Sequence, residues 1–244
     1  SMGESFIMIT SRLNDAVASE PEEVGAVAYL DAIPATPPRV EVRRVPYAFA
    51  KRMLDVVFSA VFLAIFAVPL ILIALLVKLT SHGPAFYVSE RVGLGGKRFK
   101  FYKFRTMRID ADERLRDLLQ HNEKDGPIFK MESDPRVTPI GAFLRKFSLD
   151  EMPQMIHVLT GKMTLVGPRP PLPREVTFYS EDEWTRLSVK PGLTCYWQIQ
   201  GRSDLDFETW MELDRKYIDD MSFWTDLKIL AKTPVAVISG RGAY

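Results

Sequence analysis

Two adjacent carboxylates, Asp150 and Glu151, stand at the expected start of a helix, directly after Ser148 and Leu149. The positive end of the helix dipole and the unpaired N–H groups of a first turn keep a carboxylate ionised. An ionised, partly desolvated aspartate can attack a phosphorus atom and form an acyl phosphate. Glu151 points a different way from the same turn and can hold Mg²⁺ against a diphosphate. The pair therefore suits phosphoryl transfer with Asp150 as the nucleophile.

The same residues also have a purely structural interpretation. Glu151 stands three residues after Ser148, which is the spacing of a capping box, where each side chain bonds to a free N–H group of the first turn. Pairs of this kind open many helices, so the motif by itself favours the capping role for Glu151. Whether the pair does chemistry depends on the charges around it.

Cations lie on both sides of the carboxylate pair in the sequence. Arg145 precedes it, and Arg169 follows it in the run Gly167-Pro168-Arg169-Pro170. A guanidinium in a proline-flanked turn is preorganised for bidentate contact with phosphate, although a plain turn with a solvated arginine has the same pattern. Lys103 and Arg105 share one face of an expected strand and add further positive charge. Together these cations predict a polyanionic substrate.

An uncharged apolar segment runs from Val56 to Val77. Its length matches the ~20 residues that cross a bilayer, but Pro69 near its middle removes a hydrogen bond and kinks the helix. Basic residues flank both sides: Arg43, Arg44, Lys51 and Arg52 before it, and Lys78, Arg91, Lys97 and Arg98 after it. Under the positive-inside rule, both ends then stay on the cytoplasmic side. A re-entrant helix that breaks at Pro69 satisfies these facts, and a kinked transmembrane anchor remains an equal alternative.

The residues after the apolar segment predict a small mixed domain. Residues 85–90 and 97–106 indicate two strands around a glycine-rich turn. Helices are expected at 110–122 and from Ser148 onward, and prolines at 135 and 139 indicate a loop between them.

Three regions follow from these patterns. We expect a partly disordered arm over residues 1–46, the membrane helix over 47–80 and a cytoplasmic catalytic domain over 81–244. Near the end of the chain, an apolar face over residues 223–238 lies beside two lysines, which favours a helix in the lipid headgroup layer over one that only packs on the domain. The predicted fold class is α/β and helix-rich, with a re-entrant membrane helix and interfacial amphipathic helices around a small α/β domain.

Composition excludes several other classes of protein. The 32 Lys and Arg residues nearly cancel the 31 Asp and Glu residues, which argues against a nucleic-acid partner. The single cysteine, Cys195, excludes an internal disulfide and a cysteine-based zinc site, and the three histidines show no metal-ligand spacing.

A series of short motifs is highly specific when its members are taken together and in order. They are Lys51-Arg52-Met53-Leu54-Asp55, Tyr102-Lys103-Phe104-Arg105-Thr106-Met107, Asp134-Pro135-Arg136-Val137-Thr138, Leu144 to Gln154, Leu165 to Pro170, Lys190 to Thr194, Gln198 to Arg202 and Asp226 to Leu230. With this series the chain resembles the monotopic phosphoglycosyl transferases, the bacterial sugar transferase family of polyprenyl-phosphate hexose-1-phosphate transferases. The resemblance covers about residues 51–235.

The resemblance implies specific roles. Asp150 would be the nucleophile that attacks the β-phosphate of a nucleotide sugar, and Glu151 would bind Mg²⁺ as the metal ligand. Arg145 and Arg169 would hold phosphates.

 The polyprenyl phosphate would then displace the adduct from Asp150 in a ping-pong sequence that first releases a nucleoside monophosphate. The same resemblance places Gly192, Gln198 and Arg202 among the nucleotide-sugar contacts and makes Pro69 the break of the re-entrant helix.

The resulting expectation is a bacterial inner-membrane enzyme with its catalytic domain on the cytoplasmic face. It would transfer a sugar 1-phosphate from a UDP-sugar to polyprenyl phosphate, release UMP, and prime exopolysaccharide or O-antigen synthesis, with membrane lipid as a further partner. The sugar and the oligomeric state are left open, a homodimer being one alternative. Two other functions compete: a catalytically silent, membrane-anchored scaffold that binds a nucleotide sugar, and a soluble Mg²⁺-dependent phosphohydrolase, which the apolar segment disfavours.

Overall fold

The computed structural model describes residues 41–43, 45–118, 131, 133–201 and 205–239. Most of the expected N-terminal arm therefore lies outside the described residues. The elements in chain order are α3 (Ala48–Thr80), β1 (Phe86–Val92), the 3₁₀ helix η1 (Leu94–Gly96), β2 (Arg98–Phe104), α4 (Ala111–Leu118), α5 (Pro139–Lys146), the 3₁₀ helix η3 (Leu149–Gln154), α6 (Met155–Leu159), β3 (Thr164–Val166), α7 (Pro173–Val176), α8 (Glu181–Trp184), the 3₁₀ helix η4 (Thr185–Ser188), β4 (Gly192–Thr194), α9 (Tyr196–Gln200), α10 (Phe207–Asp220) and α11 (Phe223–Ser239).

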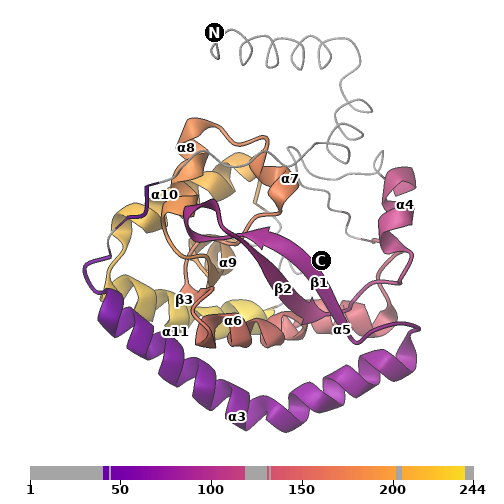
Figure 1. Cartoon of the computed structure of the whole chain (residues 1–244). Coiled ribbons are helices and arrows are strands. Elements are labelled where there is room, and N and C mark those ends of the chain that lie inside the picture. Colours follow the sequence, from indigo (N-terminus) through magenta and orange to yellow (C-terminus); the bar gives the residue numbers. More distant parts are fainter. Residues whose placement is uncertain (1–40, 44, 119–130, 132, 202–204, 240–244) are drawn as a thin grey trace, which may run out of the picture.

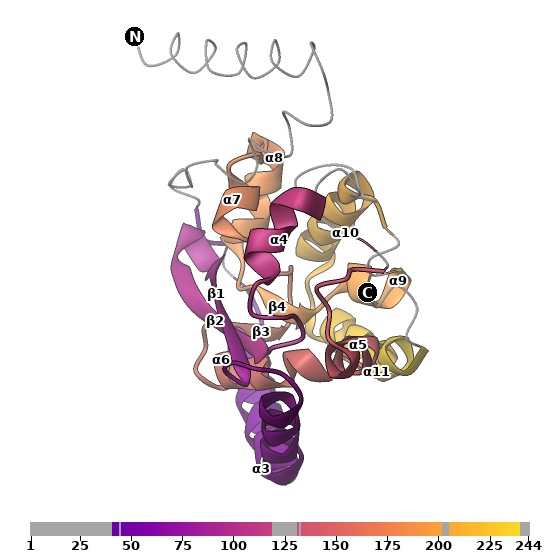
Figure 2. The same cartoon turned by 90° about the vertical axis from the view of Figure 1, so that its right-hand side faces the viewer.

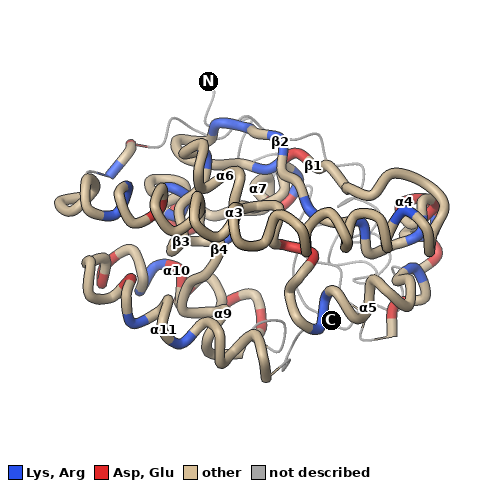
Figure 3. Tube along the Cα trace, turned by 90° about the horizontal axis from the view of Figure 1, so that it is seen from below, with Lys and Arg blue, Asp and Glu red and all other residues tan. Residues whose placement is uncertain are grey.

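Helix α3 is long, apolar and bent, and it runs beneath the rest of the described chain (Figure 1). Among the described residues it is the helix that is long and apolar enough to cross a membrane, by length and composition, and only 6% of its most apolar window is buried. Pro69 lies inside it, where it lacks the N–H group that would continue the helical ladder. Figure 2 shows α3 projecting below the domain, and Figure 3 shows that α11 shares this lower face.

The N-terminal end of α3 is fastened to the domain by a buried lysine. Lys51 Nζ lies 2.5 Å from Asp226 Oδ2 of α11 and donates to the carbonyl oxygen of Val166 at 2.8 Å. The Tyr217 hydroxyl of α10 donates to the other carboxylate oxygen of Asp226 at 2.8 Å. A buried charge needs such a set of partners, because an unpaired one is costly in the interior.

Two further polar side chains in the first turns of α3 hold the domain's central elements. Arg52 donates to the carbonyl oxygens of Val158 and Leu159 at 2.7 and 2.8 Å, at the C-terminal end of α6. Asp55 Oδ1 accepts from the backbone N–H of Leu165 in β3 at 2.9 Å. The Lys-Arg-x-x-Asp motif therefore joins the apolar helix to the domain.

The C-terminal end of α3 returns to the same domain. Val77 is buried with Phe104 of β2 and Leu144 of α5 in one hydrophobic cluster. Beyond the helix end, Arg105 donates to the carbonyl oxygens of Ser81, His82 and Pro84 at 2.9, 2.7 and 2.6 Å. Both ends of α3 are thus attached to the domain while its middle is exposed.

Two small sheets support the domain. The predicted strand pair is confirmed: β1 and β2 are antiparallel, with Phe86 opposite Phe104 and Val92 opposite Arg98. A second, parallel pair joins β3 to β4 and was not predicted. Position 192, the first residue of β4, requires glycine because a Cβ atom there would lie 2.1 Å from the backbone nitrogen of Gly167.

The loop predicted around Pro135 and Pro139 is only partly present. Pro139 instead occupies the first turn of α5, where its missing N–H group breaks no hydrogen bond. Thr138 caps this helix, because its Oγ1 atom accepts from the N–H of Gly141 at 3.0 Å. The proline was therefore a helix-start signal, and the loop prediction was wrong at this position.

Candidate active site

Asp150 is buried in the 3₁₀ helix η3 with 7% of its surface exposed. Burial, reinforced by the charge of Glu151, raises the pKa of Asp150 to about 6, and Lys103, Arg145 and Arg169 oppose this rise. An aspartate with a pKa of about 6 is mostly ionised at pH 7 but only weakly solvated. This is the state required of a carboxylate nucleophile.

The predicted capping box is absent, because the backbone of Ser148 adopts a left-handed conformation. Ser148 has φ 53° and ψ 25°, and its side chain makes no capping hydrogen bond. The chain turns here from α5 into η3, which replaces the regular α-helix expected from Ser148 onward. Glu151 is consequently free of the capping role, and its Oε1 atom accepts from Arg169 Nη1 at 3.2 Å.

Lys103 and Arg145 approach Asp150 from β2 and from the last turn of α5. Strand β2 packs against η3, and burial lowers the pKa of Lys103 to about 8 even though Asp150 favours its charged form. Arg145 Nε donates to Thr106 Oγ1 at 2.9 Å, which fixes its guanidinium beside the strand. Burial also lowers the pKa of Arg145, and the charge of Asp150 counteracts this.

Arg169 completes the set from the proline-flanked turn. Its guanidinium carbon lies 5.7 Å from the ring centroid of Trp197 in α9. The backbone of the turn is held from two sides: Arg186 Nη2 donates to the carbonyl oxygen of Arg169, and Arg91 Nη1 donates to that of Pro170, both at 3.1 Å. The turn is therefore rigid at the residue that pairs with Glu151.

Arg186, which sequence reasoning missed, forms a buried ion pair with Asp214 of α10. Their closest atoms are 2.5 Å apart, and the two side chains are 4% and 1% exposed. The Tyr179 hydroxyl accepts a further hydrogen bond from Arg186 at 2.6 Å. No local motif marks this pair in the sequence, because the two residues meet only when η4 packs on α10.

Arg91 was also missed as a site residue, since the sequence showed it only as one basic residue after the apolar segment. It lies in β1, where burial lowers its pKa to about 10 and the nearby charge of Glu175 opposes the shift. Its contact with Pro170 places it behind the Arg169 turn. We therefore assign it to positioning that turn.

The other predicted site residues have different positions. The guanidinium of Arg105 donates to the carbonyl oxygens that follow α3, so a role of Arg105 in phosphate binding stays a prediction. A role of Gly192 in binding the nucleotide sugar also stays a prediction, because the close approach of the backbone already explains why glycine stands there. Gln198 is buried in α9 beside Trp197. Arg202 lies outside the described residues.

The charges that act on Asp150 favour an anionic ligand. The charges of Lys103, Arg145 and Arg169 act on Asp150, and Arg169 also pairs with Glu151, so positive charge exceeds negative charge in this cluster. Among the described residues, no group of three or more His, Cys, Asp or Glu side chains is placed to hold a metal ion. A divalent cation would therefore need ligand oxygens in addition to Glu151, which is the usual arrangement for Mg²⁺ with phosphates.

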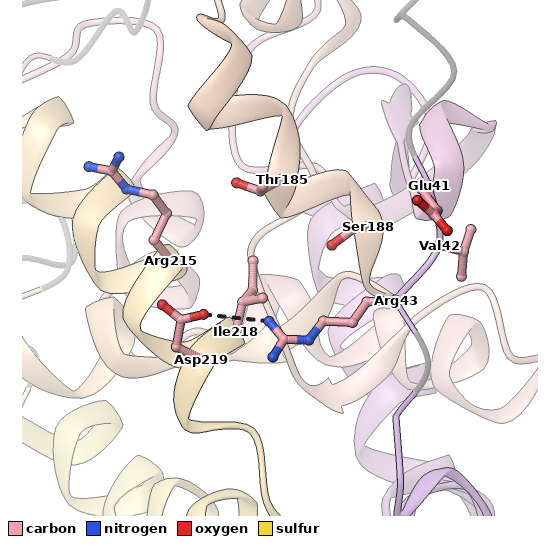
Figure 4. Close-up of a pocket in the computed structure, with 8 residues that line it drawn as sticks. All are labelled: Glu41, Val42, Arg43, Thr185, Ser188, Arg215, Ile218 and Asp219. Atoms are coloured by element: carbon pink, nitrogen blue, oxygen red, sulfur yellow. Dashed lines mark hydrogen bonds and ion pairs between the residues drawn. The ribbon is translucent and has the colours of Figure 1, made fainter.

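A separate cavity of about 550 Å³ lies between residues 41–43 and α10 (Figure 4). Arg43 Nη1 reaches Asp219 Oδ1 at 3.5 Å across it, and the two side chains are 48% and 79% exposed. An exposed pair of this kind contributes little to stability. None of the residues that line this cavity belongs to the Asp150 cluster.

The structure thus combines a bent, membrane-type apolar helix with a domain in which a buried carboxylate is surrounded by cations. The chain belongs to the bacterial sugar transferase family, whose model matches residues 46–240. The resemblance read from the ordered motifs is confirmed by this match.

Three relatives illustrate the range of the family. The chain is 44% identical over 204 residues to the undecaprenyl-phosphate galactose phosphotransferase of Salmonella typhimurium, covering 80% of this chain and 42% of that protein. It is 39% identical over 228 residues to the exopolysaccharide production protein ExoY of Rhizobium meliloti, covering 92% and 94%. It is 38% identical over 211 residues to the UDP-glucose:undecaprenyl-phosphate glucose-1-phosphate transferase of Caulobacter vibrioides, covering 82% and 74%. The chain thus spans less than half of the Salmonella protein and nearly all of ExoY.

Proposed function

We propose that this protein transfers a sugar 1-phosphate from a UDP-sugar to polyprenyl phosphate through a covalent adduct on Asp150. The observation that carries the proposal is the buried Asp150 carboxylate, which faces Lys103, Arg145 and Arg169 in a domain attached to an apolar helix. The names of the relatives, which include undecaprenyl-phosphate transferases, support the acceptor and the reaction class.

In the first step, a carboxylate oxygen of Asp150 attacks the β-phosphorus of the donor. A bond forms between that oxygen and phosphorus, and the bond from the β-phosphorus to the bridging oxygen breaks. The bridging oxygen leaves with the nucleoside monophosphate, and the sugar phosphate stays on Asp150. Lys103, Arg145 and Arg169 stabilise the charge that develops on the phosphoryl oxygens.

In the second step, an oxygen of the polyprenyl phosphate attacks the same phosphorus. The new oxygen–phosphorus bond forms the lipid diphosphate sugar, and the bond to Asp150 breaks, which returns the carboxylate to its ionised form. Neither step changes an oxidation state. Burial of Asp150 limits the access of water, which would otherwise hydrolyse the adduct.

Glu151 is the residue that would hold Mg²⁺. Its Oε1 atom accepts from Arg169, and its second carboxylate oxygen can serve an ion together with donor phosphates. Mg²⁺ takes one or two carboxylates with substrate phosphates in many phosphoryl-transfer sites. When bound, it would neutralise charge on the diphosphate.

For the membrane arrangement, we propose that α3 is re-entrant and that the domain lies at the cytoplasmic face. A straight crossing would separate the two helix ends by the ~30 Å of the hydrocarbon core, whereas Lys51 and Val77 both contact the one domain. Helix α11 exposes Trp224, Val235 and Ile238 beside two lysines. This combination suits the headgroup layer.

The test is release of nucleoside monophosphate from a panel of UDP-sugars, with Mg²⁺ and polyprenyl phosphate in a lipid environment. Wild-type protein should release UMP from at least one sugar, and Asp150→Asn should not. Asp182→Asn, which changes an exposed aspartate, is the matched control and should behave as wild type. Binding of a UDP-sugar by the wild type without turnover would support the silent scaffold instead.

A further inference from the structure

An apolar groove of about 440 Å³ lies between the second half of α3 and the domain. One wall is a stripe of α3 that includes Leu70, Ala74 and Lys78, and the opposite wall includes Phe86, Pro153 and Ile156. Apart from Lys78, the residues that line the groove are apolar. Its volume falls within the ~300–1,000 Å³ typical of ligand sites.

The groove is open rather than part of the packed interior. Phe86 and Ile156 are about half exposed on the domain side, as are Ile71 and Leu75 on α3. The groove lies beside the point at which the second half of α3 is attached to the domain, since Phe104, Leu70 and Ala74 belong both to its lining and to the hydrophobic cluster of Val77. A contiguous apolar surface of this kind normally marks a binding site or a lipid contact.

The groove shares two elements with the Asp150 cluster. Side chains alternate across a strand, so Lys103 of β2 faces the carboxylate while its neighbour Phe104 lines the groove. In η3, Asp150 belongs to the charged cluster, and Pro153 three residues later lines the groove. An amphiphile in the groove would therefore have its polar end near the cations.

We propose that this groove binds the first isoprene units of the polyprenyl phosphate acceptor and directs its phosphate toward Asp150. The inference rests on the proposed function and adds a binding site to it. Charge favours polyprenyl phosphate over a zwitterionic phospholipid as the occupant. Its phosphomonoester is an anion and complements the excess of positive charge around Asp150. A zwitterionic headgroup offers no such complement.

Photolabelling tests the occupant directly. A polyprenyl phosphate that carries a diazirine near its phosphate should label the peptide that contains Ile156 in the full-length chain. Undecaprenyl phosphate should suppress the labelling, and phosphatidylethanolamine, whose headgroup is zwitterionic, should not suppress it at the same concentration. Equal suppression by both lipids would assign the groove to bilayer acyl chains, and labelling elsewhere would overturn the proposal.

Kinetics give an independent test. Ala74→Phe fills the groove and should raise the KM for undecaprenyl phosphate by about tenfold, equivalent to ~1.4 kcal/mol, relative to Ala67→Phe on the exposed side of α3. Ile156→Glu, at a half-exposed position of the groove, should have a similar effect relative to Ile109→Glu, which changes an exposed isoleucine outside the groove. Unchanged KM values in both groove variants would refute the groove. Failure of the wild type to release UMP would instead refute the proposed function.

Discussion

Arg169 Nη1 donates to Glu151 Oε1 across 3.2 Å, and this contact joins the proline-flanked turn to the helix that carries Asp150. The two side chains remain 31% and 24% exposed, so a ligand can reach them. The contact also explains why Glu151 is available for a ligand: it is held by a cation from another part of the chain and not by the cap of its own helix.

Glu151→Gln should therefore lower activity far more than stability. The partly exposed ion pair contributes at most ~1 kcal/mol to the free energy of unfolding, whereas loss of the carboxylate should slow UMP release by at least about tenfold and raise the Mg²⁺ concentration required. Urea unfolding and a Mg²⁺ titration of activity measure the two effects. Wild-type turnover in the variant would exclude a metal role for Glu151.

The donor half-reaction should have a bell-shaped pH dependence. Below about pH 6 Asp150 becomes protonated and loses its nucleophilic form, and above about pH 8 Lys103 loses its charge. Single-turnover UMP release without acceptor isolates this step. Lys103→Arg keeps a cation at high pH and should extend the alkaline limb, and an unchanged limb would show that Lys103 does not cause it.

Asp150→Asn should stabilise the fold at neutral pH. The folded-state pKa of Asp150 is raised from 3.8 to about 6, so folding favours the protonated carboxyl group. The contribution of Asp150 to stability is therefore fully present below its unfolded-state pKa and is lost as the pH rises through 6. The amide removes the buried charge and should gain up to ~3 kcal/mol at pH 7. Thermal unfolding should show this gain shrinking as the pH falls toward 4, and an equal gain at both pH values would contradict the mechanism.

Asp214→Ala should be strongly destabilising, because it leaves the Arg186 guanidinium buried without its carboxylate. Breaking such a pair costs ~3–5 kcal/mol. Asp182→Ala, in the exposed pair with Arg215, should change stability by less than ~0.5 kcal/mol. Chemical denaturation of the two variants compares them, and similar losses would show that burial does not set the difference.

Cysteine accessibility tests the path of α3. Phe49 and Leu79 lie near opposite ends of the helix and are 81% and 82% exposed, while the native Cys195 is buried. A membrane-impermeant thiol reagent should label Phe49→Cys and Leu79→Cys from the cytoplasmic side in sealed vesicles. Ile65→Cys, in the middle of the helix, should stay unlabelled. Protection of one end alone would indicate a crossing helix.

Local sequence signals predicted several elements well. The β1–β2 hairpin followed from two strand-like runs around a glycine-rich turn, and α3 followed from an uncharged run that no soluble segment readily accommodates. Other predictions from local signals were wrong. Ser148 has the sequence of a helix cap but adopts a left-handed turn, and Pro139 starts a helix rather than a loop.

The sequence by itself determined the membrane-type helix, the carboxylate pair and the cations around it, because length, hydropathy and residue type are local properties. Only the tertiary structure decided which cations act on Asp150, since Lys103, Arg145 and Arg169 come from three separate elements. It also decided the buried pair of Arg186 with Asp214. Contacts of this kind form when distant segments pack together, and no local pattern encodes the distance between them.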